Sequence, residues 1–264
     1  MIITKDDIKK KIASIPPLPE QVQKAINYLK EGDLQKAADA VDEDIVLKQK
    51  ISSIVNSAYF GFSKKLTDTR QMFSAMGVEM AKGVILSYMV HLLAPKEWKI
   101  FTGIDFEEFQ SAFLNNAKEA LILEAGEETY KKYSDAIAII PATICLVDDL
   151  LGDKQDQVNL LIEASGLNYG TILKRFTGMS LFGIASLVAK EWNLSLSNIR
   201  AIKATECEQC EDCEVDCVIP ATLHLEFFYL VSKPMFYSLN SLITFNPKVI
   251  EIAKKNYERK INEE

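Results

Sequence analysis

Residues 56–61 read Asn-Ser-Ala-Tyr-Phe-Gly, and this run marks the end of the helix on which the interpretation of the fold depends. Asp44 is placed to cap the start of that helix. Gly61 can adopt the left-handed conformation that stops a helix, and Asn56 can hydrogen-bond backbone groups in the turn. We therefore predict that Asn56 is a structural clamp and not a ligand contact. The apolar residues between cap and stop recur at helical spacing and are expected to pack inward: Ile45, Leu47, Ile51, Ile54 and Val55.

Helix signals extend in both directions from this segment. Pro19 precedes an apolar series that Gly32 can end, Asp105 and Glu108 have capping-box spacing, and Asn246-Pro247 can open a last helix. Alternating strand patterns are weak, and glycine (11) and proline (8) are scarce for a protein made of many turns. The chain is therefore predicted to be all-α. The apolar residues expected after Pro19 are Val22, Ala25, Ile26 and Leu29, and Ile104 and Phe109 are placed to staple the helix that begins after Asp105.

Composition limits the classes of function. The chain has 264 residues, 48% of them hydrophobic, which is enough for a sizeable core. A net charge of −7 without a long basic run argues against nucleic-acid binding. The start of the chain does not resemble a signal peptide, and the longest uncharged runs, Gly83–Pro95 and Ala136–Val147, are too short to span a membrane. We expect both runs to be buried core helices, with no membrane partner, and the protein to be cytoplasmic.

Residues 15–77 together carry a specific resemblance. They contain Ile15-Pro16-Pro17-Leu18-Pro19, then Asp44, then the run at 56–61, then Met76-Gly77. This series resembles the HDOD domain, a non-catalytic relative of the HD-domain phosphohydrolases found in bacterial signal transduction. Ile45 stands where the family usually has proline and Met76 where it has leucine, and because both are apolar we expect neither to disturb the fold. The motif residues are expected to be structural: Pro17, Pro19, Asp44, Asn56, Ser57, Ala58, Phe60, Gly61, Gly77 and Trp192.

The resemblance implies an HD-domain-like multi-helical fold. We expect a single HDOD-type unit over residues 1–264, with an N-terminal helical lobe at 1–98 and an HD-like lobe at 104–264. The stretch Pro95–Gly103 interrupts two helical regions and is the expected junction, the alternative being a kinked continuation inside one domain. Residues 180–194 are similar to the family's helix that ends in Trp-Asn-Leu-Pro, with Ser195 in place of the proline.

Histidines are absent where many relatives keep them. Leu181 and Ala204-Thr205 stand at two such places, and the helix around Asp148 has none. A metal-dependent phosphohydrolase needs several histidine and aspartate ligands to activate water. The two histidines of this chain, His91 and His224, each lie in an apolar run and are expected to be core or half-buried residues. Asp148 and its neighbour Asp149 are interpreted as a polar helix end, the alternative being a remnant of the old site. No catalytic residue is predicted.

Four of the five cysteines cluster within eleven residues: Cys207, Cys210, Cys213 and Cys217. Their spacing matches a run that binds iron–sulfur clusters in bacterial ferredoxins, and it can also supply a zinc site. Three other interpretations stay open: a packed thiol stripe on a helix, a loop of free thiols, or disulfides formed in air. Cys145 stands apart and is expected to be buried. No cofactor is predicted outside this cluster.

The leading functional hypothesis is a non-enzymatic signal-transduction or regulatory interaction module, because that is what the family resemblance implies. Its expected partner is a protein of a signalling pathway, bound in trans, whose identity and stoichiometry the sequence does not specify. A redox or metal sensor built on the cysteine cluster is the alternative. A residual metal-dependent phosphohydrolase is the weakest hypothesis, because the ligands are lacking.

Overall fold

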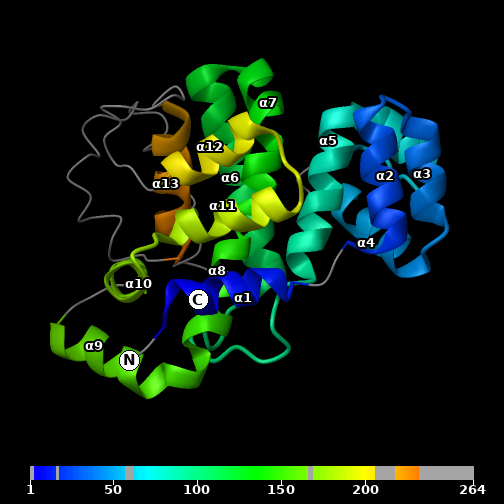
Figure 1. Ribbon diagram of the computed structural model, residues 1–264. Helices are drawn as coiled ribbons and strands as arrows, with labels where there is room; N and C mark the ends of the chain where they lie inside the picture. The colour runs from blue at the N-terminus through cyan, green and yellow to red at the C-terminus, as the bar shows by residue number, and fades with distance from the viewer. Residues whose placement is uncertain (1–2, 16–17, 57–61, 166–168, 206–217, 232–264) are drawn as a thin grey trace. The chain divides into compact units, whose positions relative to one another are not determined.

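The structure is a computed structural model, and it describes residues 3–15, 18–56, 62–165, 169–205 and 218–231 (Figure 1). Within those ranges the secondary structure is helical, without a strand, so the all-α prediction is confirmed. The chain divides into two compact units. The N-terminal unit is Ile15–Leu93, and the C-terminal unit combines Met1–Ser14 with Ala94–Glu264.

The described residues of the N-terminal unit form four helices: α2 (Glu20–Lys30), α3 (Leu34–Asp42), α4 (Ile45–Val55) and α5 (Thr69–His91). Helix α3 packs against α2, α4 and α5, and α4 also packs against α5. The predicted apolar face of α2 is buried in full, and Gly32 follows that helix with φ 79°, as expected of a helix stop. The Asp44 side chain caps α4 by accepting hydrogen bonds from the amides of Val46 and Leu47.

One expectation about α4 is corrected. Leu47, Ile51 and Val55 are buried, but Ile45 is 70% exposed and does not pack inward. The cause is its position directly after the Asp44 cap, at the first helical residue, where the side chain faces away from the core. By contrast, Met76 is buried, so the apolar residue at that motif position does serve the core.

The C-terminal unit contains the remaining elements of the described chain: α1 (Lys5–Ala13), α6 (Phe106–Ala125), α7 (Glu127–Ile139), α8 (Ala142–Leu151), a short 3₁₀ helix (Gly152–Lys154), α9 (Gln155–Ser165), α10 (Tyr169–Thr177), α11 (Leu181–Glu191), α12 (Leu196–Ala204) and α13 (Val218–Val231).

The core of this unit lies between α6, α7, α8 and α11–α13 (Figure 1). Helix α13 packs on α6, α12 packs on α7 and α11, and α8 packs on α11. Asp105 caps α6 by accepting a hydrogen bond from the Glu108 amide, as its spacing predicts.

The observed boundaries differ from the expected lobes at 1–98 and 104–264. The first unit ends at Leu93, and residues 1–14 belong with the later part of the chain. The reason is the apolar face of α1, where Ile8 and Ile12 are buried and the helix packs on α11. The stretch 95–103 is non-helical, as predicted, but it lies wholly inside the C-terminal unit.

Of the two long uncharged runs, Ala136–Val147 is buried as predicted, but Gly83–Pro95 is buried only in its helical part, because α5 ends at His91 and Leu92 is 48% exposed. Val84–Val90 lies in the second half of α5, whereas Ala136–Val147 is divided between α7 and α8 by a break at Ile140-Pro141. In the described residues, α5 is the one helix long and apolar enough to cross a membrane, with a mean hydropathy of 1.2, and 56% of that window is buried in the fold. Helices α10 and α11 pass the same test only when counted together across a 72° bend. A helix in the core of a folded protein has the same length, apolar composition and burial as α5.

Candidate functional site

Asn56 is the centre of a backbone clamp in the N-terminal unit. Its Nδ2 donates to the Leu66 carbonyl oxygen at 2.8 Å, and its Oδ1 accepts from the Leu66 amide at 2.7 Å. The same Nδ2 also donates to the carbonyl of Ser52, one turn earlier in α4. Asn56 therefore ties the end of α4 to the segment that leads into α5, which is the structural role predicted for it.

The other N-terminal motif positions are structural where they can be described. Pro19 stands at the start of α2, and Gly77 has φ 74° and ψ 175°, a non-helical geometry that interrupts α5. A residue with a Cβ is strained at this positive φ, which accounts for glycine there. The remaining motif residues lie outside the described part of the chain: Pro17, Ser57, Ala58, Phe60 and Gly61.

The Trp-Asn-Leu-Ser sequence at 192–195 forms a turn between α11 and α12. Asn193 has φ 54°, and the Leu194 amide donates back to the Ala189 carbonyl at 2.9 Å, which closes α11. Ser195 then caps α12 by accepting from the Asn198 amide. Trp192 is buried at this corner. The serine that replaces the family's proline is thus explained by a cap, which proline cannot form.

Asp148 is the candidate remnant of a catalytic acid, and its carboxylate is occupied by backbone. Its Oδ1 accepts from the amides of Lys99 (3.1 Å), Ile100 (2.7 Å) and Phe101 (3.1 Å), and its Oδ2 from Lys99 (3.1 Å). The side chain is 2% exposed. The expectation of a polar helix end is therefore corrected, because Asp148 is a buried anchor that fixes residues 99–101 against α8. Asp149 instead pairs with Lys11 of α1 near the surface.

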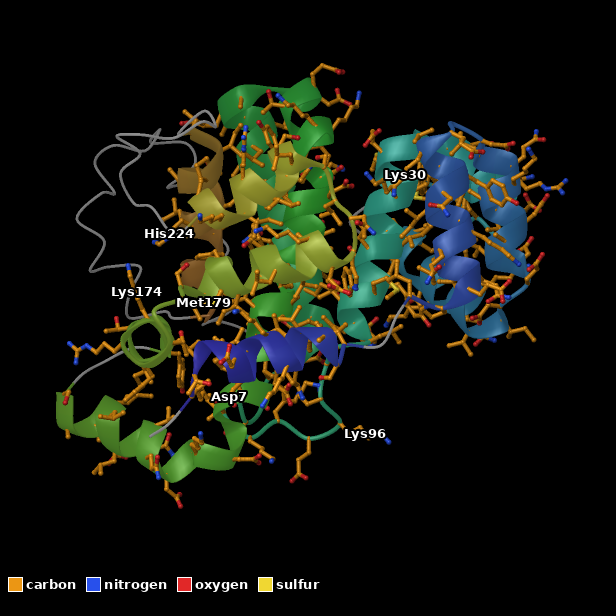
Figure 2. The ribbon with its side chains drawn as sticks, viewed as in Figure 1. Asp7, Lys30, Lys96, Lys174, Met179 and His224 are labelled. Carbon is orange, nitrogen blue, oxygen red and sulfur yellow. The ribbon has the colours of Figure 1, made fainter. Side chains whose placement is uncertain are left out.

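His224 lies on α13 and is bound locally, as expected (Figure 2). Its Nδ1 is 2.7 Å from the carbonyl oxygen of Thr205, so the ring donates its Nδ1–H to the end of α12. Thr205 is buried, with no exposed surface. Its own hydroxyl donates to the Ala201 carbonyl at 2.9 Å. The pair therefore fastens α13 to α12. His91, in the N-terminal unit, is partly buried.

Phenylalanine side chains fill the core around α13. The Phe227 ring contacts those of Phe109, Phe113 and Phe182, with centroid distances of 6.4, 6.1 and 5.0 Å and near-perpendicular planes. Phe182 also lies 6.2 Å from the His224 ring. The residue before it, Leu181, is buried. The core between α13, α6 and the start of α11 is thus packed with aromatic and apolar side chains.

One acid of α13 is fully buried. Glu226 has no exposed surface and lies one residue before Phe227. Burial raises the pKa of its carboxyl to about 8, the nearby Asn116 side chain of α6 lowers it in part, and the Glu119 charge raises it further. Sequence reasoning missed Glu226 and Asn116. A signal was present, because Glu226 is the one acid in the otherwise uncharged run Val218–Val231.

Two tests bear on a metal centre. In the described residues, no three histidine, cysteine, aspartate or glutamate side chains gather closely enough to hold a metal ion. Cys145 is buried as predicted, and that burial raises the pKa of its thiol, so it is not a ready thiolate ligand. The described residues therefore do not fit the metal centre of an HD-type hydrolase. Cys207, Cys210, Cys213 and Cys217 lie outside the described ranges.

Solved structures share this fold. A protein from Marinobacter aquaeolei VT8 named for signal transduction aligns over 99% of this chain with a TM-score of 0.65 at 14% identity. The present chain spans 59% of that protein's length. A protein from Shewanella amazonensis SB2B named as a phosphohydrolase aligns over 94% of this chain and 92% of its own length, with a TM-score of 0.63 at 15% identity. A second protein from the same organism, named as a metal-dependent phosphohydrolase, aligns over 96% of this chain and 97% of its own length, with a TM-score of 0.60 at 13% identity. The HD-like fold prediction is thereby confirmed.

Comparison with family models supplies the assignment. No curated protein matches the chain. The model of the HDOD domain matches residues 12–207, which cover most of both units and reach the first cysteine of the cluster. The resemblance stated from the motifs at 15–77 and 180–195 is therefore confirmed, and the chain belongs to the HDOD domain family.

Proposed function

We propose that this HDOD protein is a non-enzymatic regulatory module of signal transduction, which acts in the cytoplasm by binding a protein partner in trans. The observation that carries the proposal is the state of Asp148. A catalytic carboxylate must be open to a metal or to water, whereas this one accepts four hydrogen-bond contacts from three backbone amides and is 2% exposed.

The surroundings of α13 support the same proposal. The imidazole of His224 is used to hold the end of α12 through its Nδ1, and the ring lies against Phe182 in an apolar core. Hydrolysis of a phosphate ester needs a polarising ion and a bound water close to the substrate. An HDOD fold with its core filled in this way keeps the scaffold of the phosphohydrolases and offers surfaces for recognition.

Activity assays test the non-enzymatic part. The purified protein, with Mg²⁺, Mn²⁺, Ni²⁺ or Fe²⁺ added in turn, is incubated with bis-p-nitrophenyl phosphate and with p-nitrophenyl phosphate. We expect no turnover above that of the Asp148→Asn variant prepared in parallel. Turnover that is removed by a chelator and lost in Asp148→Asn, while circular dichroism shows that this variant remains folded, would overturn the proposal.

The binding part needs a defined partner. Affinity capture identifies candidates, and each is then purified and titrated against this protein by calorimetry. We expect one signalling protein to bind saturably at a fixed stoichiometry, with no nucleic acid or vesicle needed. Failure of every purified candidate to bind, alongside saturable binding to anionic vesicles or to DNA, would contradict the proposal.

The cysteine spacing favours a second candidate function, a redox or metal sensor. Four thiolates at Cys207, Cys210, Cys213 and Cys217 would hold an iron–sulfur cluster or a zinc ion. Anaerobic purification followed by elemental analysis and absorbance near 400 nm tests it, with Cys145→Ser as the matched control. A stoichiometric metal that is lost in Cys210→Ser and kept in Cys145→Ser supports the sensor. A colourless, metal-free protein from an anaerobic preparation removes it.

A further inference from the structure

Glu226 is a fully buried acid of the C-terminal unit. It lies in the middle of α13, on a helix packed against α6 and α12, and has no exposed surface. Neither of its carboxyl oxygens has a hydrogen-bond partner of good geometry within the described chain, although Asn116 is near enough to lower the pKa of its carboxyl in part. The adjacent Phe227 packs among three other phenylalanine rings. An ionised carboxylate is strongly disfavoured in such surroundings.

Among the described residues, the charged groups near Glu226 do not compensate a negative charge there. Glu119 of α6 repels a second negative charge and adds to the effect of burial. His224, on α13 itself, uses its Nδ1 to bind the Thr205 carbonyl. The other titratable or charged groups of the packed helices lie at or near solvent: Glu107, Glu108, Lys118 and Glu124 on α6, Lys190 and Glu191 on α11, and Arg200 and Lys203 on α12.

We propose that α13 is seated on α6 through the protonated carboxyl of Glu226, so that loss of this proton to solvent releases α13 from the core. The helix is then a pH-sensitive latch. It closes while Glu226 is neutral and opens as the carboxyl ionises, because the ionised form is stable only in water. The direction agrees with the pKa of about 8, against a usual value of 4.5.

Opening of α13 would affect two neighbouring parts of the chain. It breaks the hydrogen bond from His224 to Thr205, the residue that directly precedes the cysteine-containing segment 206–217. It also uncovers the rings of Phe109, Phe113 and Phe182, which Phe227 covers in the closed state. The inference goes beyond the proposed function, which holds whether or not α13 opens.

Hydrogen exchange tests the latch with the full chain. Exchange of the amides at 219–227 is compared between the unmutated protein and Glu226→Gln at the same pH, so that the intrinsic pH dependence of exchange cancels. Glutamine has the shape of the protonated acid and does not titrate. We expect the two proteins to be equally protected near pH 5. Above pH 5, the exchange rate of the unmutated protein divided by that of Glu226→Gln should grow by on the order of tenfold per pH unit, until about pH 8. Glu163→Gln, which removes an exposed charge on α9, should behave as the unmutated protein.

Three outcomes would overturn the latch. The first is equal protection of α13 in Glu226→Gln and the unmutated protein at every pH. The second is a loss of protection that spreads equally over α6, α8 and α11, which indicates global unfolding. The third does not depend on a variant that folds: titration of carbon-13-labelled glutamate carboxyls by NMR in the unmutated protein. A carboxyl that titrates well above the others supports the latch, and a set that all titrates near 4.5 overturns it.

Discussion

Two of the deeply buried acids of the C-terminal unit, Asp148 and Glu226, differ in how their carboxyl groups are accommodated. Asp148, at the end of α8, is surrounded by the backbone amides of residues 99–101, which can stabilise its negative charge. Glu226, in the middle of α13, has no exposed surface, and neither of its carboxyl oxygens has a comparable set of donors among the described residues. One acid accepts hydrogen bonds from backbone amides and fixes a loop, and the other, in our proposal, is held neutral and depends on pH. Burial alone therefore does not tell what an acid does.

Removing Asp148 should give the largest effect. In Asp148→Ala, three amides lose a shared acceptor inside the fold, and we expect the free energy of unfolding to fall by about 3–5 kcal/mol. Urea denaturation followed by circular dichroism measures it. Asp149→Ala, which loses only a half-exposed ion pair with Lys11, should cost less than about 1 kcal/mol. Equal losses in the two variants would show that the amides do not need the carboxylate.

Removing the charge of Glu226 should have the opposite sign. Between pH 4.5 and pH 8 the folded protein binds a proton that the unfolded chain has released, so this residue lowers stability as pH rises, by up to about 1.4 kcal/mol per unit. Its full contribution is present below pH 4.5. We expect Glu226→Gln to be more stable than the unmutated protein by about 3 kcal/mol at pH 7 and no more stable at pH 4.5. The difference between their urea midpoints across this range measures it, and a constant difference would contradict the assignment.

Asn56 extends the comparison to a neutral side chain in the N-terminal unit. Asn56→Ala breaks both hydrogen bonds to Leu66, and we expect a loss of about 1–3 kcal/mol. Thermal unfolding measures the loss, and hydrogen exchange should localise it to residues 62–69. Ser52→Ala is the matched control, because it keeps the carbonyl that Asn56 binds and removes only a 3.4 Å contact. An unchanged exchange pattern in Asn56→Ala would mean that the loop is held by other contacts.

His224 should show the smallest effect of the four. Replacing it by phenylalanine keeps the ring contact with Phe182 and removes the bond to the Thr205 carbonyl, at a cost of about 1 kcal/mol. Thr205→Val, which retains that carbonyl, separates this bond from the threonine hydroxyl's own bond to Ala201. Chemical denaturation of both variants at pH 7 measures the two losses. A gain in stability in His224→Phe would show that packing outweighs the hydrogen bond.

Local signals in the sequence predicted much of the fold, because caps and helix stops depend on neighbouring residues. Asp44, Gly32 and Asp105 could be placed in this way, and each does what its spacing indicates. The lobe boundary was misplaced because the burial of Ile8 depends on α11, which is far away in the chain. The roles of Asp148 and Glu226 depend likewise on distant groups, the amides of residues 99–101 for one and α6 for the other. A sequence pattern shows that an acid is present, but its partners come from the tertiary fold.

The division of the chain has a consequence for how the protein is made. The C-terminal unit begins with α1, leaves off at Ser14 and resumes at Ala94, so the whole of Ile15–Leu93 is an insertion within it. During synthesis, α1 emerges before α11, so its buried face stays uncovered until α11 has been made. Folding of the insertion between them reduces the entropy cost of bringing α1 and α11 together. A fragment that starts at Ala94 would lack α1, so the surface of α11 against which α1 packs would be exposed to solvent. Truncations for expression should therefore retain residues 3–14, or reconnect them by circular permutation.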